Sequence, residues 1–124
     1  MYTIVCDGGC NKKGCYGSYI IYDDNGSEVA NSSRFELADC HTNNEAEYGA
    51  LLEAVYAAMV SLDTDVELQI YTDSQLVCKQ LSGSFKIKSN NLVSFNKEAR
   101  LRLSNYFWKV RWVPRRIIVG FLGH

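Results

Sequence analysis

The strongest constraint on the fold is a helix that the run Asn43-Asn44-Glu45-Ala46-Glu47 begins. Thr42, Asn43 and Asn44 are all good N-cap residues, and an acid stands three positions after Thr42 and again after Asn44, which is the signature of a capping box. The helix is predicted to run to about residue 60, because apolar residues recur at helical spacing. These residues are Ala50, Leu51, Leu52, Ala54, Val55, Ala57, Ala58 and Met59.

The two acids of this run are predicted to point in opposite directions. At about 100° per residue, Glu47 lies within roughly 40° of Leu51 and Ala54, whereas Glu45 lies roughly 160° away from Glu47. We therefore expect Glu45 to face solvent and to support the helix dipole. A carboxylate in the core-facing stripe must be paired, protonated or bound to a cation. Glu47 is therefore a candidate functional residue.

The remaining pattern predicts one α/β domain over residues 1–124. Strands are expected at 2–6, 16–22, 27–37, 66–71 and 107–113, with further helices at 74–81 and 92–106 and a weakly helical tail. The first three strands form an antiparallel meander, and the right-handed strand–helix–strand crossover makes the fourth strand parallel to a neighbour. The expected architecture is a five-stranded mixed sheet flanked by helices.

Two aspartates follow predicted strands: Asp7 opens the turn Asp7-Gly8-Gly9, and Asp73 follows the strand at 66–71. Open α/β sheets place ligands at the carboxyl ends of their strands. On adjacent strands, the Cα atoms of the two residues would lie about 5 Å apart. Their carboxylates would then repel unless a divalent cation lay between them. Glu47 completes the predicted cluster.

The charge distribution is uneven along the chain, although the net charge is only −1. Residues 1–73 hold thirteen acidic and three basic residues, whereas residues 74–124 hold ten basic residues and one acid. This asymmetry is typical of an acidic site beside a basic, nucleic-acid-binding surface, although the two halves could also merely solvate opposite faces.

The sequence also bears on location. No apolar run reaches transmembrane length, and the start has no basic region typical of a signal peptide, so no membrane association is expected. Five cysteines at irregular spacings favour a reducing cytoplasm over a disulfide framework. Cys6, Cys10 and Cys15 with His41 match no established zinc spacing.

Four motifs in this order resemble type 1 ribonuclease H over essentially the whole chain. They are Asp7-Gly8-Gly9, Thr42 to Tyr48, Tyr71 to Val77, and Arg111-Trp112-Val113-Pro114-Arg115. The resemblance implies the RNase H-like fold and metal-dependent hydrolysis of the RNA strand of RNA/DNA hybrids. It also implies that Asp7, Glu47 and Asp73 are catalytic residues that hold two Mg²⁺ or Mn²⁺ ions.

The resemblance further implies which residues contact the hybrid, while no obligate protein partner is inferred. Asn43, Asn44 and Gln75 match substrate-contacting positions, and amides can donate to and accept from a 2′-hydroxyl. The two asparagines could equally serve as helix caps. The backbone around Gly8, Cys10 and Asn11 is expected to contact the sugar, and four basic residues are candidates for phosphate contacts: Lys86, Lys88, Arg115 and Arg116.

The chain departs from the family pattern in two places. Only residues 85–91 stand where the common bacterial form has a long basic protrusion, as in shorter, archaeal-like members. The family's fourth acid is absent, because no acid follows Glu98. His124 stands near its place, and an imidazole can bind a transition metal or act as a base. His124 is therefore a candidate catalytic residue and metal ligand, or else simply a terminal residue.

Two other functions remain open at this point. The missing fourth acid is compatible with a domain that binds nucleic acid without cutting it, although Asp7, Glu47 and Asp73 argue against this. A nuclease of the same fold that acts on double-stranded RNA or DNA is equally compatible, because a fold alone does not determine the substrate.

Overall fold

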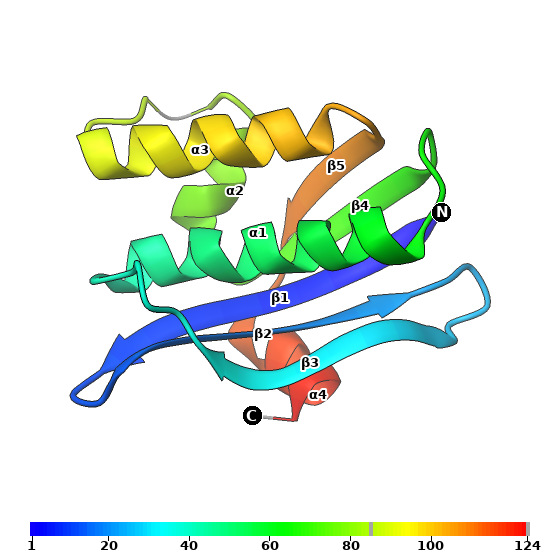
Figure 1. Ribbon diagram of the computed structural model, residues 1–124, viewed down its shortest axis with the longest axis horizontal. Coiled ribbons are helices and arrows are strands. Elements are labelled where there is room, and N and C mark those ends of the chain that lie inside the picture. The colour runs from blue at the N-terminus through cyan, green and yellow to red at the C-terminus, as the bar shows by residue number, and fades with distance from the viewer. Residues whose placement is uncertain (85, 124) are drawn as a thin grey trace.

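A computed structural model describes residues 1–84 and 86–123 and shows a five-stranded mixed sheet (Figure 1). The strand order is β3-β2-β1-β4-β5; β1, β2 and β3 are antiparallel, while β4 is parallel to β1 and β5 is parallel to β4. The strands are β1 Tyr2–Asn11, β2 Gly14–Tyr22, β3 Glu28–Glu36, β4 Glu67–Thr72 and β5 Phe107–Trp112. The helices are α1 Asn43–Ser61, α2 Gln75–Leu81, α3 Asn90–Leu103 and α4 Arg115–Leu122. The predicted architecture is confirmed.

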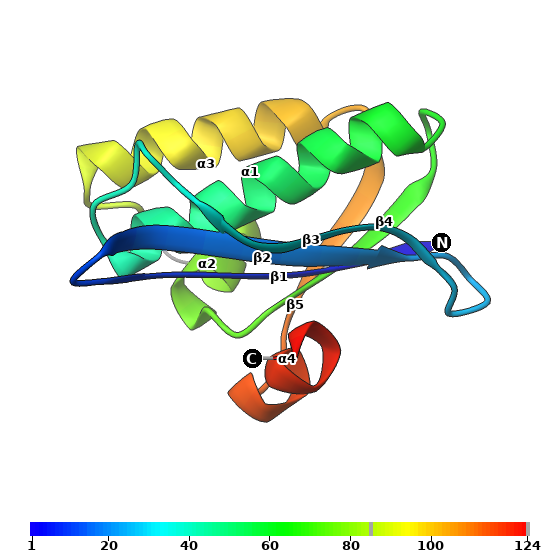
Figure 2. The ribbon, with the colours of Figure 1, turned by 60° about the horizontal axis from the view of Figure 1, so that its bottom comes forward.

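The helices cover the two faces of the sheet unequally (Figure 2). α1 and α3 pack side by side on one face and enclose the main core, which includes Ile4, Leu51 and Leu103. α4 lies on the other face, where its buried Ile118 packs with Val5 and Ile20. No helix among the described residues is both long and apolar enough to span a membrane.

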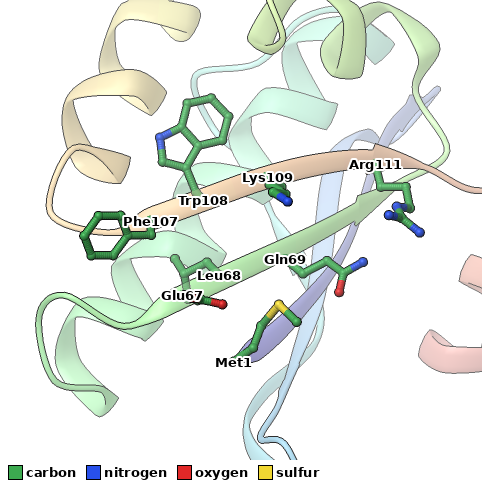
Figure 3. Close-up of a pocket in the computed structure, with 8 residues that line it drawn as sticks. All are labelled: Met1, Glu67, Leu68, Gln69, Phe107, Trp108, Lys109 and Arg111. Carbon is green, nitrogen blue, oxygen red and sulfur yellow. The ribbon is translucent and has the colours of Figure 1, made fainter.

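A pocket of about 390 Å³ lies where β4 and β5 begin (Figure 3). Glu67, Gln69, Phe107 and Lys109 are among the residues that line it. Asp73 follows the opposite end of β4, and none of the predicted catalytic carboxylates lines this pocket. The pocket is therefore separate from the predicted site.

Strand β1 is longer than predicted, and the turn expected at Asp7-Gly8-Gly9 is not there. β1 continues to Asn11, because Asp7 to Asn11 pair with β2 through to the contact between Asn11 and Gly14. The chain reverses only after Asn11, whose side-chain Oδ1 accepts a hydrogen bond from the Lys13 N–H at 2.8 Å. The glycines that suggested a turn instead serve close packing.

Gly8 is the point where β1 meets the start of α1. A Cβ atom at this position would lie 2.1 Å from the carbonyl oxygen of Ala46 and 2.8 Å from the backbone nitrogen of Glu47. Real Cβ atoms essentially never approach backbone atoms so closely. The absence of a side chain at Gly8 therefore brings Glu47 up to the strand.

A buried hydrogen-bond network holds α2 and α3 against α1. The Tyr48 hydroxyl donates to Gln80 Oε1 at 2.7 Å and accepts from Asn96 Nδ2 at 3.2 Å. Arg100 extends the network by donating to Asn96 Oδ1 and to the carbonyl oxygens of Gln80 and Leu81. Because buried polar groups are costly when unpaired, this network fixes α2, which begins two residues after Asp73.

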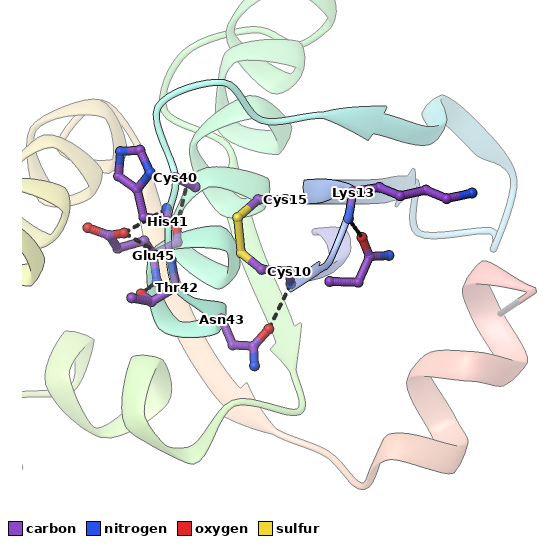
Figure 4. The surroundings of a disulfide bond; sticks show 9 residues. Cys10, Lys13, Cys15, Cys40, His41, Thr42, Asn43 and Glu45 are labelled. Atoms are coloured by element: carbon purple, nitrogen blue, oxygen red, sulfur yellow. Dashed lines mark hydrogen bonds between the residues drawn. A yellow bond between two sulfur atoms is a disulfide. The ribbon is translucent and has the colours of Figure 1, made fainter.

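The prediction that Glu45 faces solvent is wrong, since Glu45 is only 4% exposed. Its Oε1 accepts hydrogen bonds from the backbone N–H groups of His41, at 2.8 Å, and Thr42, at 3.1 Å (Figure 4). Thr42 Oγ1 accepts from the Glu45 N–H in return, which completes the predicted capping box. Side chains on a helix lean towards its N-terminus, so the preceding loop covers Glu45 although the helical wheel places it outside.

Replacing Glu45 by alanine should therefore destabilise the protein. We expect Glu45→Ala to lower the free energy of unfolding by about 1–2 kcal/mol, because two backbone donors lose their acceptor. Urea unfolding curves measure this loss. Glu53→Ala, on the same helix and at an exposed position, is the control. Equal stability of Glu45→Ala and the wild type would contradict the capping role.

The cysteine pattern favoured a reducing environment over a disulfide framework, and the structure contains one disulfide, between Cys10 and Cys15 (Figure 4). These residues face one another directly across the β1–β2 hairpin. Cys6, Cys40 and Cys78 are free thiols. The disulfide also removes the zinc alternative for Cys10 and Cys15, since metal binding requires free thiolates.

Candidate active site

The pairing of β1 with β4 brings Asp7 and Asp73 to one place. Val5 is paired with Tyr71 in the parallel ladder. Asp7 lies two residues after Val5, and Asp73 lies two residues after Tyr71. The Asp7 side chain is fully buried, and that of Asp73 is 11% exposed. The indole N–H of Trp112, at the end of β5, donates to the Asp73 carbonyl oxygen at 3.1 Å. Asp73 is thus fixed from the neighbouring strand.

Glu47 reaches the same place from the first turn of α1. Its Oε1 accepts a hydrogen bond from the Gly8 N–H at 2.8 Å, and its Oε2 accepts a long one, at 3.5 Å, from Thr72 Oγ1. The predicted core-facing direction of Glu47 is confirmed: the side chain is half-buried, and Leu51 and Ala54 on the same stripe are fully buried.

The three carboxylates form a group that could hold a metal ion. Ligand oxygens of Asp7, Glu47 and Asp73 all lie within 4.8 Å of one another. Hard carboxylate oxygens are the ligands that Mg²⁺ and Mn²⁺ prefer. The donor set therefore fits a divalent ion.

The electrostatics of the cluster also favour a cation. Burial raises the pKa of Glu47 to about 9; the hydrogen bond from the Gly8 N–H opposes this rise, while the charges of Asp7 and Asp73 and a hydrogen bond with Asp7 add to it. Without a metal, Glu47 is therefore protonated at neutral pH. Ionisation of Glu47 beside Asp7 and Asp73 becomes favourable when a divalent cation binds the three carboxylates.

This pKa predicts the pH dependence of the metal-free protein. The folded pKa lies above the unfolded one, so the folded state keeps a proton that the unfolded state has released between about pH 5 and about pH 9. Stability conferred by protonated Glu47 is full below this window and is lost as the pH rises through it. We expect the free energy of unfolding of the wild type to fall between about pH 6 and about pH 8 by more than that of Glu47→Gln, because glutamine does not titrate. Urea unfolding of both proteins at the two pH values measures this difference. A constant difference between the two proteins would contradict the raised pKa.

Arg115, the first residue of α4, contacts two of the three carboxylates. One nitrogen, Nη1, donates to Asp7 Oδ1 at 2.8 Å and to Asp73 Oδ2 at 2.9 Å. The hydrogen bond with Asp73 is the largest cause of a raised Arg115 pKa. The sequence suggested a phosphate contact for Arg115 and did not indicate this pairing, because the two aspartates lie far from Arg115 in the chain.

Two of the predicted substrate-binding residues, Asn43 and Asn44, lie with Glu47 in the first turns of α1. Asn43 Oδ1 accepts a hydrogen bond from the Cys10 N–H at 2.7 Å, so the helix start is tied to the disulfide-bonded hairpin (Figure 4). Asn44 lines a pocket of about 490 Å³ together with Lys86 and Lys88. An amide and two cations thus share one groove, as contacts with a sugar–phosphate backbone require.

The other predicted residues lie outside this groove or are already engaged. Gln75 lines a smaller pocket of about 150 Å³ with Trp112. Arg116 is exposed on α4. The N–H of Gly8 is used by Glu47, and the Asn11 side chain accepts from the hairpin turn. His124 lies outside the described residues, so its role as a fourth ligand remains a prediction.

Sequence reasoning missed two residues that support the cluster. Thr72 contacts Glu47 and also accepts a hydrogen bond from the Ser74 N–H at 3.0 Å, and Trp112 holds the Asp73 backbone. Thr72 continues the alternation of Leu68 and Ile70 in β4, whose side chains are buried, so the sequence pattern could have predicted its inward direction. The contact of Trp112 depends on the pairing of β4 with β5, which no local pattern encodes.

A family model described as RNase H matches residues 1–113. The chain belongs to the RNase H family. Among curated relatives, Ribonuclease HI of Halobacterium salinarum is 41% identical over 75 residues, which is 60% of this chain and 37% of that protein. Bifunctional protein Rv2228c of Mycobacterium tuberculosis is 31% identical over 102 residues, which is 81% of this chain and 27% of that protein. The chain thus spans about a third of the length of these relatives.

Solved structures of RNase H proteins match nearly the whole chain. RNase H1 of H. salinarum superposes with a TM-score of 0.84 at 28% identity and covers 98% of this chain and 92% of that one. The N-terminal RNase H domain of Rv2228c superposes with a TM-score of 0.83 at 26% identity and covers 98% of this chain and 94% of that one. LC11-RNase H1, solved in complex with an RNA/DNA hybrid, superposes with a TM-score of 0.78 at 23% identity and covers 97% of this chain and 90% of that one. At this identity the similarity shows the fold alone.

Proposed function

We propose that this RNase H-family protein is a metal-dependent endonuclease that hydrolyses the RNA strand of RNA/DNA hybrids. The observation that carries the proposal is the close approach of the Asp7, Glu47 and Asp73 carboxylates, within 4.8 Å. A groove lined by Asn44, Lys86 and Lys88 adjoins the start of α1, the helix that also carries Glu47. Family membership supports the reaction class. Cytoplasmic location is part of the proposal; the free thiols Cys6, Cys40 and Cys78 support it, whereas the Cys10–Cys15 disulfide does not.

In this proposal, Asp7, Glu47 and Asp73 hold two divalent ions, Mg²⁺ or Mn²⁺, and His124 is a further candidate ligand. When bound, the ions supply an activated water and neutralise the charge that develops on the leaving oxygen. Glu47 must release its proton to bind, so loading the site at neutral pH also releases a proton to solvent. The Gly8 N–H then keeps the Glu47 carboxylate oriented.

The proposed recognition of the hybrid divides between sugar and phosphate contacts. Asn43, Asn44 and Gln75, at the starts of α1 and α2, are proposed to read the 2′-hydroxyl of the RNA strand. Asn43 is held by the Cys10 N–H, which leaves its amide nitrogen available to donate. Lys86, Lys88 and Arg116 are proposed to contact phosphates.

A cleavage assay tests the proposal. Labelled RNA/DNA hybrid, double-stranded RNA and double-stranded DNA are each incubated with Mg²⁺, with Mn²⁺ and with a chelator. We expect cleavage of the RNA strand of the hybrid with either metal, with 5′-phosphate and 3′-hydroxyl ends, and a loss of at least about 10³-fold in chelator, because metal chemistry supplies several kcal/mol.

Each other outcome points to a different function. Cleavage of double-stranded RNA or DNA in preference to the hybrid would indicate a nuclease with another substrate. Binding without cleavage under all metal conditions would indicate a nucleic-acid-binding domain. Cleavage that persists in chelator, or products with cyclic phosphates, would exclude the metal mechanism.

A further inference from the structure

The carboxylate cluster already contains one cation, and that cation is part of the chain. Nη1 of Arg115 lies 2.8 Å from Asp7 Oδ1 and 2.9 Å from Asp73 Oδ2. A single nitrogen therefore bridges two carboxylates that come from different strands. Both carboxylates belong to the cluster that could bind a metal.

This pairing compensates the buried negative charges of the metal-free protein. The Asp7 side chain has no exposure to solvent, and Asp73 has little. A buried carboxylate is strongly unfavourable without a neighbouring positive charge or hydrogen bonds. Arg115 supplies both the charge and the donors, so it stabilises the folded state when no metal is bound.

The same contact is incompatible with a loaded site. A divalent ion binds carboxylate oxygens directly, at about 2.0–2.1 Å for Mg²⁺, and it would approach the oxygens that Arg115 now bridges. The positive charges of ion and guanidinium would also repel at this distance in a poorly hydrated site. Metal binding therefore requires Arg115 to move away.

The backbone of Arg115 is held while its side chain is able to move. Just before it, the Val113 N–H donates to the Thr72 carbonyl oxygen at 2.9 Å, and three residues later Ile118 is fully buried under the sheet. The Arg115 side chain itself is 54% exposed. It can turn towards solvent without any change in α4.

We propose that Arg115 is an internal counter-ion that occupies the cation site of the metal-free protein and is displaced when a divalent ion binds. This inference rests on the proposed metal site and adds to it a built-in competitor that lowers metal affinity. Only the fraction of molecules with Arg115 displaced is competent to bind, so the apparent dissociation constant rises in inverse proportion to that fraction. Arg115 lies beyond the 1–113 match to the family model, so the match itself does not imply this role.

The test is Mn²⁺ binding without nucleic acid, measured by titration calorimetry and by the loss of free-ion signal in electron paramagnetic resonance. We expect Arg115→Ala to bind Mn²⁺ at least about tenfold more tightly than the wild type. This factor corresponds to a wild type in which the Arg115 side chain occupies the site in about nine of ten molecules. Arg116→Ala is the matched control, since it removes the same charge from the exposed neighbouring position. We expect its affinity to stay within about twofold of the wild type, because solvent and salt screen an exposed charge.

Thermal melting separates this role from a merely structural one. Without metal, Arg115→Ala should melt several degrees below the wild type, and Mn²⁺ should raise its melting temperature more than that of the wild type. Arg115→Lys keeps the charge, so its Mn²⁺ affinity should lie closer to that of the wild type.

Mn²⁺ affinity of Arg115→Ala that is equal to or weaker than that of the wild type would overturn the displacement proposal and leave the proposed nuclease function standing. Absence of Mn²⁺ binding in both proteins would instead overturn the metal site and with it the proposed mechanism.

Discussion

Asp73→Asn should lower the cleavage rate by about 10³-fold or more while the protein remains folded. An amide is a poor ligand for a divalent ion in place of a carboxylate, and the lost transition-state stabilisation amounts to several kcal/mol. Folding should persist because the asparagine side-chain oxygen still accepts a hydrogen bond from Arg115 and because repulsion between carboxylates decreases. Single-turnover cleavage of a labelled hybrid and thermal melting measure the two effects.

Asp63→Asn is the matched control for this substitution. Asp63 is an exposed acid just beyond the far end of α1, and its neutralisation changes the net charge equally. We expect the control to cleave at the wild-type rate within about twofold, since exposed charges act weakly at a distance. An Asp73→Asn protein that retained most of its activity would show that the chemistry lies elsewhere.

Gly8→Ala should damage both stability and activity. The new Cβ would lie 2.1 Å from the Ala46 carbonyl oxygen, which is backbone and cannot rotate away. The start of α1 must therefore move from β1, at a cost of about 3 kcal/mol, the upper end of what overpacking usually costs. Glu47 would move with it, and a displacement of about 1 Å at a catalytic group can lower the rate about 10²-fold.

Gly120→Ala is the control for Gly8→Ala. Gly120 lies within α4, and a Cβ at this position would meet no atom within 4 Å. Alanine there should be neutral or should stabilise the protein by up to about 1 kcal/mol, because alanine is the better helix former. Urea unfolding and single-turnover cleavage distinguish the two substitutions. A Gly8→Ala protein as stable and as active as the wild type would contradict the close approach of β1 and α1.

Local patterns carried most of the fold and the centre of the site. Apolar residues at helical spacing predicted α1, and their phase directed Glu47 inward. The N-cap candidates Thr42, Asn43 and Asn44 placed the helix start correctly, and the structure selects Thr42 with Glu45. The crossover rule made β4 parallel to its neighbour, which brought Asp7 and Asp73 together.

The errors arose where a second segment, distant in sequence, decides the environment of a residue. Glu45 is buried because the preceding loop folds over it, although its position on the helical wheel is outward. β1 continues past Gly8 and Gly9 because β2 pairs with it, although two glycines in succession are typical of a turn.

The sequence by itself determined the order of the strands and helices, the start and inward face of α1, and the three acids that converge. Periodicity and capping express these features locally, since they depend on backbone geometry within a few residues. The tertiary structure alone decided the disulfide between Cys10 and Cys15 and the pairing of Arg115 with Asp7 and Asp73. Both depend on short contacts between side chains of separate elements, and such contacts exist only once strand register and helix packing have placed those elements together.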